Sequence, residues 1–216
     1  MGNLFLFICF CIEINRILYR KECFILFAYS HHVMSLQIQW FVKENSHYSV
    51  DTPTFSWANM KPDFIPNLAK RKHYIEESFD FVVDKILSLL KLPSYNLLDK
   101  NKRRRIDVEM GIICHFLTDF FCAPHNQRWE FKHHMIPHVK YESILDQKAK
   151  SLNIVEKLKM PPILDNSRES ISQFLKDLLE EYEQKKDYMR DIIFSVNVSS
   201  TVCNYIIKGI MSNNKM

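Results

Sequence analysis

The sequence from Ile112 to Cys122 is almost entirely apolar, yet it carries an imidazole and a carboxylate, at His115 and Asp119. On a helix these two residues stand at i and i+4, so their side chains share one face with Cβ atoms ~5–6 Å apart. Apolar residues cover most of the remaining circumference, which is typical of a buried helix. A charge in such a helix is costly unless it is paired or binds a metal. We therefore predict a buried central helix, from about Arg103 to Cys122, that carries functional groups.

A second pair of the same kind follows at His138 and Glu142, and His125 comes directly after Pro124. Zinc binds imidazole nitrogen and carboxylate oxygen, and helices often supply these ligands in i, i+4 pairs. Each element alone has a simpler interpretation, an ion pair for His138 with Glu142 and a helix-end histidine for His125. Together, the two pairs and His125 predict a zinc site.

Composition indicates the fold class. The chain has 216 residues, of which 47% are hydrophobic and three are glycine. A chain of this length fits one domain with a sizeable core, and sheet-rich folds need more glycine for their turns. The predicted fold is all-α, a single-domain helical bundle over residues 30–216. Periodicity predicts helices over 33–42, 73–90, 103–122, 138–152, 167–186 and 188–211, with a proline-containing loop over 45–67.

The first 29 residues form a hydrophobic segment whose role stays open. The apolar run from Leu4 to Ile12 is interrupted by Glu13, and basic residues begin only at Arg16. A secretory signal places its positive charge first, and a membrane span needs ~20 apolar residues. Three interpretations remain: a membrane-proximal segment, an atypical signal, or sequence outside the functional domain.

Charge and cysteine content limit which partners and which cellular compartment are expected. A formal net charge of +4 is too small and too dispersed to indicate a nucleic-acid partner. The basic cluster Lys100, Lys102, Arg103, Arg104 and Arg105 is either a solvated helix start or a contact for phosphate or anionic lipid. The six cysteines show no CxxC spacing and predict no disulfide framework. The expected location is therefore cytoplasmic or membrane-associated, ahead of secretion.

The motif His115-x3-Asp119-x5-His125, followed by His138-Val-Lys-Tyr-Glu142, resembles the core signature of the zinc-dependent phospholipase C family. The resemblance is greatest to its short, single-domain bacterial members, and it implies an all-α domain with zinc ions set between helices. Three outlying segments are similar to family positions in the same order. They are Ser30-His31, Pro62-Asp63 and His73, which on spacing alone are ordinary turn or helix-start residues.

The resemblance implies a role for each residue. It places His73, His115 and Asp119 on one zinc, His125, His138 and Glu142 on a second, and lets Asp119 bridge to a third ion near His31. It makes Asp63 the general base or the group that orients the attacking water. Two alternatives stay open. One has His32 as the ligand in place of His31, and the other has His134, four residues before His138, as a competing ligand.

The function that the resemblance implies is phosphodiester hydrolysis at a phospholipid head group, with two or three zinc ions as cofactors. The expected partners are a phospholipid or another phosphodiester, and a membrane surface. A nuclease of the S1/P1 type is an alternative, although that related family typically has aspartate where Glu142 stands. A non-catalytic metal-binding helical protein is the third. Secreted family members bind their third zinc through an N-terminal tryptophan, whereas some thirty residues precede His31 here.

Overall fold

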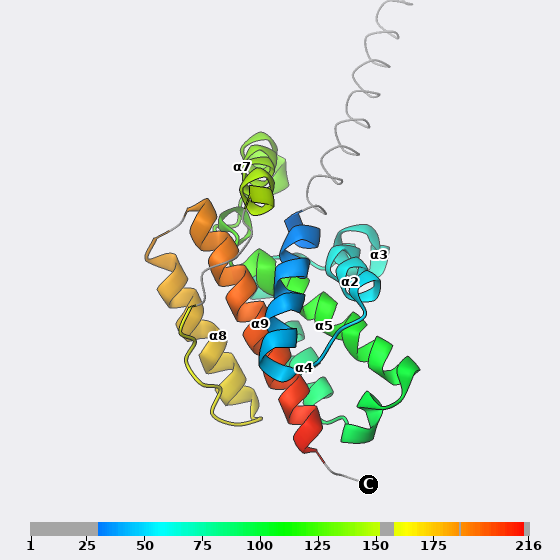
Figure 1. Ribbon diagram of the computed structural model, residues 1–216. Helices are drawn as coiled ribbons and strands as arrows, with labels where there is room; N and C mark the ends of the chain where they lie inside the picture. The colour runs from blue at the N-terminus through cyan, green and yellow to red at the C-terminus, as the bar shows by residue number, and fades with distance from the viewer. Residues whose placement is uncertain (1–29, 152–157, 186, 214–216) are drawn as a thin grey trace, which may run out of the picture.

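The computed structural model describes residues 30–151, 158–185 and 187–213, so the hydrophobic segment 1–29 lies outside it. Every element in these ranges is helical, which confirms the all-α prediction (Figure 1). The elements are a helix over residues 30–46, α2 (Thr52–Phe64), α3 (Pro66–Ala69), α4 (Ile75–Leu90), the 3-10 helix η1 (Ser94–Leu97), α5 (Lys100–Phe120), α6 (Ala123–Asn126), α7 (Phe131–Ser151), α8 (Arg168–Glu183) and α9 (Tyr188–Ser212). None of these helices combines the length and hydrophobicity needed to cross a bilayer.

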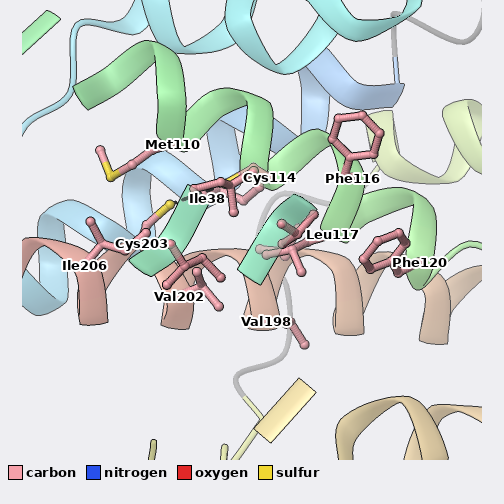
Figure 2. Close-up of a cluster of buried hydrophobic side chains, with 14 of the residues drawn as sticks. Ile38, Met110, Cys114, Phe116, Leu117, Phe120, Val198, Val202, Cys203 and Ile206 are labelled. Atoms are coloured by element: carbon pink, nitrogen blue, oxygen red, sulfur yellow. Dashed lines mark hydrogen bonds between the residues drawn. The ribbon is translucent and has the colours of Figure 1, made fainter. Parts of the chain in front are cut away.

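Helix α5 is the central element of the bundle and contacts α2, α4 and α9. All its residues from Met110 to Phe120 are buried, as the apolar sequence predicts. Figure 2 shows side chains of α5 and α9 packed together, with Ile38 of the 30–46 helix beside them. At this contact the Sγ atoms of Cys114 and Cys203 lie 3.3 Å apart, and both are free thiols. The core therefore holds α5 in place from several sides. It thereby also fixes the position of His115 and Asp119, near the C-terminal end of α5.

Helices α2 and α5 approach each other closely at Gly111. A Cβ added there would lie 2.6 Å from Ala58 Cβ and 2.8 Å from the carbonyl oxygen of Phe55. Gly111→Ala is therefore expected to lower the free energy of unfolding by about 1–3 kcal/mol, because overpacking outweighs the ~1 kcal/mol gain in helix propensity. Urea unfolding of the two proteins measures the difference. An unchanged or higher midpoint would contradict the close packing.

The predicted loop over residues 45–67 is wrong in its middle, because α2 occupies much of it. Asp51 caps this helix by accepting a hydrogen bond from the Thr54 N–H, and Pro53 lies in its first turn. Proline is accepted at that position since the first N–H groups of a helix have no intrahelical partner. Pro62 lies inside the helix, which continues only to Phe64. Pro53, at a position that a helix tolerates, and Pro62, near the end of the helix, therefore concealed α2 in the sequence.

Helix α7 begins earlier than predicted and is kinked. Its backbone leaves helical geometry at His134, with φ −128° and ψ 22°, and Pro137 follows in the next turn. A proline is tolerated there because it falls in the first turn after the kink. The kink leaves His134 exposed while His138 is buried.

The basic residues that open α5 are only partly solvated. Arg103 donates a hydrogen bond to the Ser49 carbonyl, and Arg104 donates one to Thr54 Oγ1. Both contacts tie the start of α5 to the segment around the beginning of α2. Part of the basic cluster therefore has a structural role.

Candidate metal centre

The eight site residues that the sequence predicts converge at one end of the helical bundle. They come from six places in the chain, and all are largely buried. His31 lies in the helix over residues 30–46, Asp63 in α2, His73 just before α4, His115 and Asp119 in α5, His125 in α6, and His138 and Glu142 in α7. Three groups among them have donor atoms within 4.8 Å of one another.

The first donor set is formed by His73, His115 and Asp119. His73 Nδ1 lies 3.1 Å from His115 Nε2, and these nitrogens lie 3.0 and 3.2 Å from Asp119 Oδ2. Zinc bonds of ~2.0–2.1 Å in tetrahedral geometry separate neighbouring donors by ~3.3–3.5 Å. The three atoms are therefore spaced as ligands of one zinc ion. Asp63 Oδ1 is slightly farther, 3.6 Å from His73 Nδ1 and 3.7 Å from His115 Nε2.

Asp119 presents its other oxygen to different histidines. Its Oδ1 lies 3.2 Å from His31 Nε2 and 3.7 Å from His125 Nε2. The His31 ring also stacks on the His115 ring, with 4.1 Å between centroids. This carboxylate therefore has the geometry to bridge two cations, one at each oxygen. Of the two adjacent histidines, it is His31 whose ring reaches Asp119.

The second donor set is formed by His125, His138 and Glu142. Glu142 Oε1 lies 3.1 Å from His125 Nε2 and 2.8 Å from His138 Nε2. His134, the alternative in this region, is exposed at the α7 kink. The chain therefore offers a further set of two imidazoles and one carboxylate, next to the first.

Backbone carbonyls orient two of these imidazoles. His115 Nδ1 lies 2.7 Å from the carbonyl oxygen of Asn59, and His138 Nδ1 lies 3.2 Å from that of Trp129. A ring nitrogen that donates to a carbonyl leaves the opposite Nε2 with its lone pair available, as in many zinc sites. Sequence reasoning missed Asn59 and Trp129, since a carbonyl contact leaves no signature in residue type.

Three groups of the site have the protonation state that a metal requires, whereas His31 does not. Burial alone would lower the pKa of His31, but the Asp119 carboxylate, together with those of Asp63 and Glu142, outweighs burial and raises this pKa to about 9. Burial lowers the pKa of His115, and the His31 cation lowers it further. Burial would raise the pKa values of Asp119 and Glu142, yet the neighbouring histidines hold both below their ordinary range. His115 is thus neutral and both carboxylates are ionised, the states in which these groups bind zinc.

The buried polar atoms provide a test of this fit. Within the described ranges, Asp119 Oδ2 and Asp63 Oδ2 are buried and accept no hydrogen bond of acceptable geometry. A buried carboxylate oxygen normally has a hydrogen-bond partner or a metal. Because imidazole nitrogens lie around Asp119 Oδ2 at ligand spacing, a cation satisfies this oxygen and the nitrogens together. The donor atoms therefore fit zinc.

The fold and the site together define a class: an all-helical protein with candidate metal-binding groups set among its helices. Comparison with known families agrees with this class. Residues 30–189 match the family described as zinc dependent phospholipase C. Since the match covers most of the chain, the protein belongs to this family. Neither the curated proteins nor the solved structures contain a significant match to the sequence.

Proposed function

We propose that this protein hydrolyses the head-group phosphodiester of a phospholipid. The observation that carries the proposal is the arrangement of imidazole nitrogens around both oxygens of Asp119, with His31 at Oδ1 and His73 at Oδ2, in a member of this family. In the proposed assignment His73, His115 and Asp119 hold one zinc, and His125, His138 and Glu142 hold a second. His31, with Asp119, is the start of a third site.

Asp63 is the residue proposed to act on water. Its side chain is about one-seventh exposed, and its Oδ1 faces the first donor set at 3.6–3.7 Å. When bound, zinc supplies Lewis acidity to phosphoryl oxygens and acidifies water. The Asp63 carboxylate accepts a proton as the water oxygen bonds to phosphorus. The bond from phosphorus to the glycerol oxygen breaks, and that oxygen takes a proton. The products are a diacylglycerol and a phosphorylated head group.

An exposed aromatic pair beside the site supports a lipid substrate. Phe64 follows Asp63 directly, and Trp57 stacks on it with ring centroids 6.2 Å apart. Both side chains are exposed, Phe64 at 39% and Trp57 at 48%. Aromatic side chains of this kind are favoured at membrane interfaces. The pair thus offers an apolar surface next to the residue proposed to act on water.

The substrate class is tested by assaying the zinc-loaded full-length chain against phosphatidylcholine vesicles and, separately, single-stranded DNA. We expect diacylglycerol to be released, the release to stop when EDTA removes the metal, and added zinc to restore it. Cleavage of DNA without lipid hydrolysis would assign the protein to the nuclease type. No hydrolysis of either substrate by the zinc-bound protein would favour the non-catalytic alternative.

A further inference from the structure

A buried carboxylate outside the donor sets connects the elements that carry the second set. Asp191 lies in the first turn of α9 and is 1% exposed. Its Oδ1 accepts a hydrogen bond from the Tyr182 hydroxyl at 2.7 Å. Its Oδ2 accepts two, from the Tyr141 hydroxyl at 2.8 Å and from the Ala123 N–H at 3.0 Å. Burying a carboxylate is costly unless several donors satisfy it, and here three donors do so.

Two of these three donors stand next to proposed zinc ligands. Ala123 is the first residue of α6 and precedes His125 by two positions. Its N–H is one of the groups that a helix start leaves without an intrahelical partner. Tyr141 directly precedes Glu142 on α7. Asp191 Oδ2 therefore ties the two backbone segments that present His125 and Glu142 to a single atom.

The remaining ligand of the set is connected to the same place. The ring of Trp129, whose carbonyl faces His138 Nδ1, packs edge-on against the ring of Tyr141 at 5.7 Å. Tyr188 of α9 also contacts the Tyr141 ring, with 4.3 Å between the two ring centroids. Tyr141 is thus held by α9 through both its ring and its hydroxyl.

We propose that Asp191 is a positioning residue for the zinc bound by His125, His138 and Glu142. The inference rests on the metal-binding part of the proposed function and does not depend on the substrate. Ligand atoms must stay within about 0.5 Å of their working positions. The two bonds to Asp191 Oδ2 hold α6 and α7 in register, so that His125 Nε2 and Glu142 Oε1 remain 3.1 Å apart. Asp191 lies beyond residues 30–189, the segment that matches the family.

The chain contains its own matched control. Tyr141→Phe and Tyr182→Phe each delete one hydroxyl that donates to the same carboxylate. Tyr141 adjoins a proposed ligand, whereas Tyr182 lies on α8, which carries none of the eight site residues. A role confined to stability predicts similar effects for the two changes. A positioning role predicts that only Tyr141→Phe alters zinc binding.

The experiment measures zinc dissociation constants of the full-length proteins by competition with a chelator, beside their urea midpoints. Tyr141→Phe is expected to weaken one class of bound zinc by about tenfold, the lower end for groups that support metal ligands, and to leave the others unchanged. Tyr182→Phe is expected to stay within about twofold of wild type. Equal changes in both variants, or no change in either, would overturn the positioning role. If wild type binds no zinc, the proposed function fails as well, so the two failures are distinguishable.

Discussion

His115→Ala is expected to lower lipid hydrolysis by about a thousandfold or more, because several kcal/mol of charge stabilisation would depend on the zinc that His115 is proposed to bind. His115 is the one residue shared by two of the three candidate groups, with His31 and Asp119 in one and with Asp63 and His73 in the other. Its Nδ1 is engaged by the Asn59 carbonyl, so Nε2 is the only nitrogen left to bind a metal.

The His115 variant should also lose zinc. Removing a direct ligand is expected to weaken zinc binding by more than the 10–100-fold that is typical for second-sphere groups. Elemental analysis of the purified variant would therefore give less zinc per chain than wild type. The matched control is His134→Ala, because His134 is a neighbouring but exposed histidine. Equal zinc content and activity in wild type and His115→Ala would contradict the assignment.

Asp63→Asn is expected to lower the turnover number by about 10²–10⁴-fold while zinc content stays unchanged. The amide has the shape of the carboxylate but does not accept a proton from water. Zinc should remain because His73 Nδ1, His115 Nε2 and Asp119 Oδ2 lie within 3.0–3.2 Å of one another without Asp63.

Two other outcomes for Asp63→Asn have distinct meanings. Loss of zinc would make Asp63 a ligand in place of the proposed base. Unchanged hydrolysis would exclude a catalytic role. The control is Asp107→Asn, which alters a buried carboxylate that bonds the Tyr48 hydroxyl and the Asp51 N–H. This change should lower stability by ~1–3 kcal/mol and leave turnover of the folded protein within about twofold.

The sequence allowed the prediction of those features that depend on spacing within one helix. His115 and Asp119 lie on one face of α5 because residues four apart are neighbours on a helix, and the structure places their donor atoms 3.2 Å apart. Pro124 ends the sequence pattern of α5, and the chain restarts as α6, which carries His125. The all-α class followed from composition and periodicity and is confirmed. The metal-binding roles of these residues stay predictions.

Features that depend on packing between distant segments were not predictable in this way. Adjacent residues on a helix differ by about 100° in direction. The choice between His31 and His32 therefore depends on how the helix over residues 30–46 packs, which the sequence does not show. The sequence predicts a loop around Asp63, because Pro53 and Pro62 conceal α2. Asp191 contacts Tyr141, which lies 50 positions away in the sequence, and Ala123, which lies 68 positions away. No local pattern marks such a pairing.

X-ray diffraction from crystals of the zinc-loaded protein, recorded at the zinc absorption edge, tests the central claim most directly. The anomalous map should show one peak ~2 Å from His73 Nδ1, His115 Nε2 and Asp119 Oδ2, and a second ~2 Å from the donor atoms of His125, His138 and Glu142. Zinc held elsewhere, for instance by cysteine sulfur, with these side chains unliganded, would contradict the account.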